Sequence, residues 1–144
     1  MKAKSLSSIK TLAAVTGMSL ALAACMPQEA GAPVRSPDLV GHQWYLQSLG
    51  GHGLVGGTRI ALNFDATSSV TGSGGCNRLF GAWRRNGDRL NLTGMGATKM
   101  ACAGPVMQRE GAFLAALDRV NRYTIAPDGS LVLFTNDNSQ LVFR

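Results

Sequence analysis

The middle of the 144-residue chain reads Val70-Thr71-Gly72-Ser73-Gly74-Gly75-Cys76-Asn77-Arg78-Leu79-Phe80-Gly81. A strand-like run ends at Gly72, and another begins at Leu79. The glycines between them allow the backbone to curl tightly, and Asn77 supplies polar groups that satisfy the backbone of such a bend. We therefore expect two strands joined by a glycine-rich bend that ends at Cys76.

The natural partner of Cys76 is Cys102. The chain has three cysteines, and Cys25 directly follows an apolar N-terminal run. Two cysteines in an oxidising compartment predict a disulfide. It would close a loop of about 25 residues and contribute about 3–4 kcal/mol. A redox-active or metal-binding pair is the alternative, although the C-x-x-C spacing typical of those functions is absent.

The N-terminal segment is typical of a bacterial export signal. It carries lysines at positions 2, 4 and 10, followed by an apolar run at 12–24, which is shorter than the roughly 20 residues that span a bilayer. Leu22-Ala23-Ala24-Cys25 resembles a lipobox, in which the cysteine thiol becomes lipidated. An ordinary secretory signal with an incidental cysteine is the alternative. Met26 replaces the aspartate that often marks inner-membrane retention, which favours the outer membrane, facing the periplasm.

The remaining chain predicts a tether and one domain. Residues 25–37 contain three prolines and few large apolar side chains, which is typical of a flexible tether. Residues 38–144 suffice for one compact domain. Three of the 14 Lys and Arg residues lie in the signal, so 11 face 8 acids in the mature chain, a net charge of +3. The arginines are scattered rather than clustered, which argues against a nucleic-acid partner.

The domain is predicted to be α+β and predominantly β. Asn86-Gly87-Asp88 is a strong hairpin signal. Gly104-Pro105 begins one helix, with an apolar stripe that we extend to Val120. This pattern favours a small curled antiparallel sheet or cracked barrel with one packed helix. Its strands are expected near residues 42–49, 58–64, 69–72, 79–84, 89–92, 123–125, 131–134 and 140–143.

Glu110 lies inside the apolar stripe of the expected helix. A carboxylate in that position must be paired or hydrogen-bonded, with Arg78 as the preferred partner and Lys99 as the second choice. Together with Asn77 these residues would form a structural polar cluster joining helix, disulfide and sheet. The alternative is a polar anchor for the head group of a ligand.

Other motifs carry little chemistry. Residues 51–56 match G-x-G-x-x-G, but a strand rather than a helix is expected after them, so a hairpin loop is the better interpretation. Ser73 lies among glycines, yet His42 and His52 both fall in or beside the first strand, which provides no argument for a triad. We predict no catalytic residue, metal or cofactor.

Trp44, the Gly75-Cys76-Asn77-Arg78 block and the Thr98-Lys99-Met100-Ala101-Cys102 block resemble the META domain family, which includes HslJ-like bacterial lipoproteins. The resemblance implies a small barrel-like fold with one helix, no catalytic residues, and a role in envelope stress or antibiotic tolerance through binding or structural support. The alternative is a carrier or pilot that holds a lipid or apolar peptide inside the barrel. A barrel filled by Trp44, Phe64, Trp83 and Phe113 would weigh against a carrier.

Overall fold

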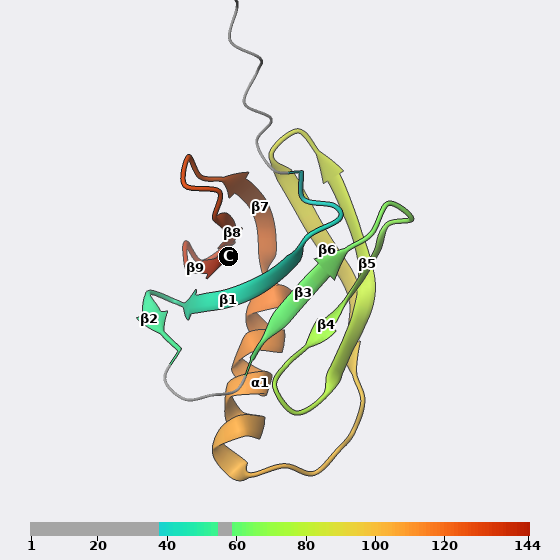
Figure 1. Cartoon of the computed structure of the whole chain (residues 1–144), viewed down its shortest axis with the longest axis vertical. Helices are drawn as coiled ribbons and strands as arrows, with labels where there is room; N and C mark the ends of the chain where they lie inside the picture. Colours follow the sequence, from blue (N-terminus) through green and yellow to red (C-terminus); the bar gives the residue numbers. More distant parts are fainter. Residues whose placement is uncertain (1–37, 55–58) are drawn as a thin grey trace, which may run out of the picture. The chain divides into compact units, whose positions relative to one another are not determined.

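A computed structural model describes residues 38–54 and 59–144. The expected signal (1–24), with Cys25, the expected tether (25–37) and residues 55–58 lie outside the described residues. In the described part no helix is both long and apolar enough to span a membrane. The same part contains one helix and nine strands: β1 (Gln43–Leu49), β2 (His52–Gly53), β3 (Ala61–Phe64), β4 (Ser69–Ser73), β5 (Arg78–Asn86), β6 (Arg89–Ala97), α1 (Gly104–Leu117), β7 (Val120–Ile125), β8 (Leu131–Thr135) and β9 (Gln140–Phe143) (Figure 1).

Eight of these strands form a closed antiparallel barrel. Neighbours run in the order β1-β3-β4-β5-β6-β7-β8-β9, and β9 pairs back onto β1. Leu46 lies opposite Phe143 in that closing pair, while β2 pairs only with the end of β1. The predicted mainly β fold with one packed helix is therefore confirmed, but the barrel is closed rather than cracked. Closure gives both terminal strands a hydrogen-bonding partner, which removes the exposed edges that an open sheet would leave.

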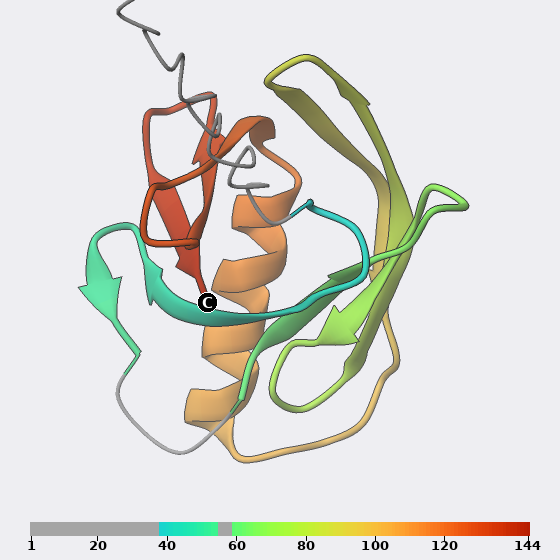
Figure 2. The same ribbon diagram turned by 45° about the horizontal axis from the view of Figure 1, so that its top comes forward.

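The weakest seam of the barrel lies between β6 and β7. These strands share one register pair, Arg89 with Arg122, and the Tyr123 N–H donates to the Asp88 carbonyl at 2.9 Å. The chain leaves β6 at Ala97, forms α1, and returns as β7. Figure 2 shows the helix with the β5–β6 hairpin on one side and the β8–β9 strands on the other. The helix is therefore the connection between the two barrel strands that pair least.

The inside of the barrel is filled by side chains. Trp44, Phe64, Trp83 and Phe113 are all buried. The rings of Phe64 and Trp83 meet edge to face with centroids 5.7 Å apart, and Phe113 of α1 meets Phe143 of β9 at 6.2 Å. Both buried indole N–H groups are satisfied, since Trp44 donates to the Leu39 carbonyl and Trp83 to the Asp65 carbonyl. The core is a packed aromatic and aliphatic cluster.

Local sequence signals explain most element ends. The β5–β6 hairpin turns at Gly87-Asp88, with a positive φ of 60° at Gly87 alone, as a type II′ turn requires. Gly72 is needed for a different reason, because a Cβ there would collide with the Ala61 carbonyl oxygen on β3. The expected helical stripe was too long at its end: α1 stops at Leu117 and Val120 begins β7.

Candidate functional site

The glycine-rich bend between β4 and β5 is the best-organised polar feature of the domain. It brings Asn77 against Glu110 of α1, and both side chains are buried, at 5% and 6% exposure. The helix approaches so closely that a Cβ on Gly74 would lie 2.5 Å from Glu110 Oε2. Gly74 therefore makes room for the Glu110 carboxylate. We call this group of Cys76, Asn77, Thr98, Met100 and Glu110 the Asn77–Glu110 cluster.

Glu110 accepts three hydrogen bonds in this cluster. Its Oε2 receives the Asn77 N–H at 2.7 Å and the Cys76 N–H at 3.2 Å, and its Oε1 receives Asn77 Nδ2 at 2.6 Å. Burial alone would raise the pKa of the Glu110 carboxyl, but these hydrogen bonds outweigh burial and hold the pKa below its ordinary value. The carboxylate is thus kept ionised in the interior by amide donors.

Asn77 connects Glu110 to the segment that follows β6. Its Oδ1 accepts the Thr98 hydroxyl at 3.0 Å and the Met100 N–H at 2.7 Å. Its own carbonyl accepts the Gly74 N–H at 2.9 Å, which closes the bend. Both ends of the Asn77 amide are therefore used, and a single side chain holds the bend, the β6–α1 connection and the helix together.

The predicted disulfide between Cys76 and Cys102 is confirmed. It joins the bend to the β6–α1 connection across a Cα–Cα distance of 6.0 Å. Cys76 belongs to the Asn77–Glu110 cluster, and Cys102 lies two residues after Met100 of the same cluster. The disulfide and the hydrogen bonds therefore fasten the same two segments. This arrangement is a structural brace.

The expected cationic partners of Glu110 lie elsewhere. Arg78 is exposed and takes part through its backbone, whose N–H donates to Thr98 Oγ1 at 3.1 Å, and Lys99 is exposed as well. The ion pairs among the described residues join Arg85 to Asp38, Arg119 to Asp137 and Arg144 to Asp128. Partnering Glu110 with Arg78 was therefore wrong. Amide donors already satisfy the carboxylate, and the side chain of Arg78 stays in solvent.

The remaining candidate residues show structural roles or exposure. Ser73 Oγ accepts the Gly75 N–H at 3.2 Å, inside the bend. His42 and His52 are exposed. Within residues 38–54 and 59–144, no three His, Cys, Asp or Glu side chains gather in a way that could hold a metal ion.

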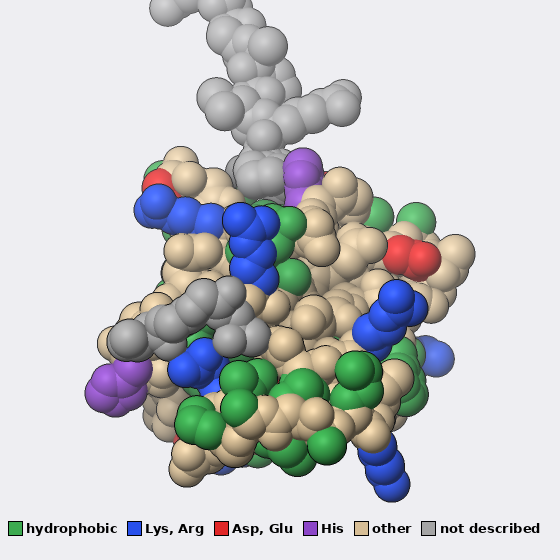
Figure 3. All heavy atoms as spheres, turned by 60° about the horizontal axis from the view of Figure 1, so that its bottom comes forward, with side chains coloured by type: hydrophobic (Ala, Val, Ile, Leu, Met, Phe, Trp, Pro, Cys, Tyr) green, Lys and Arg blue, Asp and Glu red, His purple; other side chains and the backbone are tan. Residues whose placement is uncertain are grey.

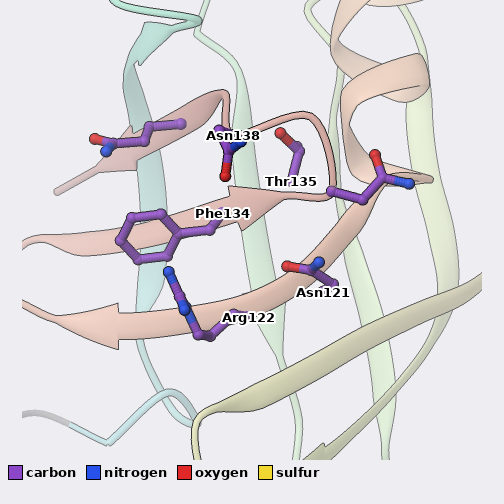
Figure 4. Close-up of a pocket in the computed structure, with 7 residues that line it drawn as sticks. Asn121, Arg122, Phe134, Thr135 and Asn138 are labelled. Atoms are coloured by element: carbon purple, nitrogen blue, oxygen red, sulfur yellow. The ribbon is translucent and has the colours of Figure 1, made fainter.

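Two surface features were missed by the sequence analysis. Met100 and Met107, on either side of the start of α1, are 61% and 46% exposed, and hydrophobic side chains gather in a band on the face drawn in Figure 3. A polar hollow also lies over β7, β8 and the β8–β9 turn (Figure 4). Neither has a sequence signature, because each depends on which strands become neighbours.

The closed barrel, its single helix and the braced bend define a small all-antiparallel barrel domain. The META domain family model matches residues 37–144, and the chain belongs to this family. This confirms the resemblance carried by the Gly-Cys-Asn-Arg and Thr-Lys-Met-Ala-Cys blocks.

Solved structures show the same fold. A protein from Burkholderia xenovorans, solved by NMR, is similar at a TM-score of 0.59 and 26% identity, covering 82% of this chain and 97% of its own. A second protein solved by NMR is similar at a TM-score of 0.57 and 22% identity, covering 72% of this chain and 87% of its own. No curated protein matches this chain significantly.

Proposed function

We propose that the chain is a non-enzymatic lipoprotein of the cell envelope, anchored through Cys25 in the outer membrane and facing the periplasm. Its META domain would act by binding or structural support under envelope stress or antibiotic challenge. The observation that carries this proposal is the filled and braced barrel. Its buried polar side chains, Asn77, Glu110, Ser130 and Thr135, all have hydrogen-bonding partners within the fold.

These partners support a structural rather than a chemical use of the buried polar groups. A catalytic group needs a free side chain and space for a reacting atom. Here Glu110 accepts three hydrogen bonds from the backbone and side chain of the bend. Its low pKa also suits a permanent acceptor rather than a general acid.

The carrier alternative receives less support. A lipid or apolar peptide held inside the barrel would need the volume that Trp44, Phe64, Trp83 and Phe113 occupy. Opening that volume would expose much of the core to solvent, at a large cost in stability. Binding on the outer surface requires no such change, so we place the function there.

The anchoring is tested by replacing Cys25 with Ser and separating membranes from soluble protein. The proposal expects the wild-type chain in the membrane fraction and the Cys25→Ser chain in the soluble envelope fraction. The matched control replaces Cys76 and Cys102 with Ser, which should leave the chain in the membrane. Retention of Cys25→Ser in the membrane would contradict the anchor.

The role is tested in cells that lack the protein. Restoring the wild-type chain should restore growth under an antibiotic that acts on the envelope, whereas the Cys25→Ser chain at equal abundance should restore less. Equal growth with and without the protein, across several envelope-directed antibiotics, would contradict the role.

A further inference from the structure

The outer face of β7, β8 and β9 presents a row of three side chains, Arg122, Phe134 and Gln140. Arg122 lies opposite Phe134, and Phe134 lies opposite Gln140, so the three form one line across three neighbouring strands. Strands lie about 4.8 Å apart, which gives the line a span of about 10 Å. The Arg122 guanidinium lies 4.7 Å from the centroid of the Phe134 ring, a cation–π distance that fixes both groups.

A hollow of about 270 Å³ covers this row. Four carboxamide side chains line it beside Arg122 and Phe134: Asn121, Asn136, Asn138 and Gln140. In Figure 4, Arg122 reaches toward the ring of Phe134, with Asn121 on the same strand and Asn138 on the β8–β9 turn. We call this group the amide hollow. A second hollow of about 230 Å³ adjoins it and shares Asn121 and Arg122.

The four amides are available to a ligand. In the described part of the chain, none of their side chains makes a hydrogen bond to the protein, whereas the turn that carries two of them is held by other groups. Thr135 Oγ1 donates to Asp137 and also lies 3.0 Å from the Ser139 carbonyl oxygen, and Asp137 forms an ion pair with Arg119 at 3.3 Å. Asn138 adopts a positive φ of 64°, which asparagine tolerates.

We propose that the amide hollow binds a neutral glycan chain. Each carboxamide offers both an acceptor oxygen and an NH₂ donor, and sugar hydroxyls are likewise donors and acceptors. A flat ring such as Phe134 provides the apolar contact that the C–H face of a sugar requires. Among the described residues that line the hollow, Arg122 alone is charged, and the nearby Asp137 is paired with Arg119. This lining suits an uncharged ligand rich in hydroxyl or acetamido groups.

Other ligand classes fit less well. A peptide strand would need free backbone groups at a sheet edge, but β8 is paired with β7 and β9, and β9 is paired with β8 and β1. A phosphate would use Arg122 and Arg89 of the adjoining hollow, yet the four amides would have no partner. Because the backbone groups of these strands are already paired within the closed barrel, a ligand on this face would be recognised by side chains.

The test uses the full chain, purified in detergent, and ligand-observed NMR. N-acetylglucosamine tetramer and cellotetraose are followed by saturation transfer to their protons, and inorganic phosphate is followed by broadening of its phosphorus resonance. The variant combines Asn121→Ala with Gln140→Ala, and Asn91→Ala is the matched control because it removes an exposed amide from β6 that lines neither hollow. All of these side chains are exposed, and unfolding by urea checks that each variant keeps its fold.

The expected result is binding of at least one tetrasaccharide. Loss of one hydrogen bond weakens binding about five-fold, so the double variant should bind at least tenfold more weakly, with Asn91→Ala unchanged. Absence of binding by both sugars would overturn the proposal, as would equal binding by the double variant, or binding of phosphate alone. This outcome is independent of the Cys25 fractionation, because the hollow belongs to the domain whether or not the chain is lipidated.

Discussion

Replacing Glu110 with Gln should destabilise the domain almost as much as removing the side chain. The change keeps the shape and removes one negative charge, which would be expected to help in a buried site without a cation. Here it does not help, because all three groups that face the carboxylate are N–H donors: Cys76 N, Asn77 N and Asn77 Nδ2. The carboxylate is the only form of this side chain that accepts from all of them.

The size of the loss follows from the geometry. A glutamine oxygen in place of Oε2 keeps two backbone hydrogen bonds, but its NH₂ group then meets Asn77 Nδ2, donor against donor. Asn77 cannot turn its amide, because Oδ1 already accepts from Thr98 and from the Met100 N–H. Losing one charged hydrogen bond and weakening two others should cost about 2–4 kcal/mol, against about 3–5 kcal/mol for Glu110→Ala.

The assay is urea unfolding between pH 3 and pH 7, followed by the fluorescence of the buried Trp44 and Trp83. The folded-state pKa of Glu110 lies below its unfolded value, so its contribution is complete above about pH 4.3 and is lost as the pH falls through the folded-state pKa. The gap between wild type and Glu110→Gln should therefore be constant near neutral pH and shrink in acid.

A matched control is Asp118→Asn, which removes an exposed carboxylate just beyond the C-terminal end of the same helix. It should change the free energy of unfolding by less than about 0.5 kcal/mol. The reasoning is refuted if Glu110→Gln costs no more than this control, or if its gap to wild type is the same at pH 3 and pH 7.

Three further perturbations test the brace and the core. Replacing Cys76 and Cys102 with Ser should lower the free energy of unfolding by about 3–4 kcal/mol, and urea midpoints that match the wild type would contradict a stabilising disulfide. Gly72→Ala should prevent normal pairing of β3 with β4, because the new Cβ would meet a backbone carbonyl oxygen. Gly53→Ala has open space around the new Cβ and should retain the wild-type melting temperature. The same melting temperature for both variants would disprove the close approach at Gly72. Phe113→Ala should cost about 3–5 kcal/mol by calorimetry, since the ring is fully buried in the barrel, and a cost below about 1 kcal/mol would place that ring outside the core.

The sequence predicted those parts of the fold that depend on local pattern. Asn86-Gly87 indicated a hairpin, because glycine adopts a positive φ without strain. Pro105 indicated the start of α1. The number of cysteines, together with the oxidising compartment expected from the N-terminal segment, predicted the disulfide. Glu110 was recognised as a buried carboxylate because its position in the apolar stripe leaves it no route to solvent.

What the sequence did not predict depends on contacts between distant segments. Closure of the barrel is decided by β9 pairing with β1, across almost the whole domain, and no local pattern reports it. Arg78 was a reasonable partner for Glu110 by charge, but the tight bend turns backbone N–H groups toward the carboxylate instead. The amide hollow could not be predicted from the sequence, because the row of Arg122, Phe134 and Gln140 is formed by the registers of three strands.

Native mass spectrometry of the full chain, extracted from membranes in detergent, distinguishes an anchored domain with a filled barrel from a lipid or peptide carrier. We expect a chain that begins at a lipidated Cys25, lacks two hydrogens because of the disulfide, and carries no apolar ligand that leaves on denaturation. An unmodified Cys25, or a lipid or apolar peptide released only when the barrel unfolds, would contradict an anchored domain that works from its outer surface.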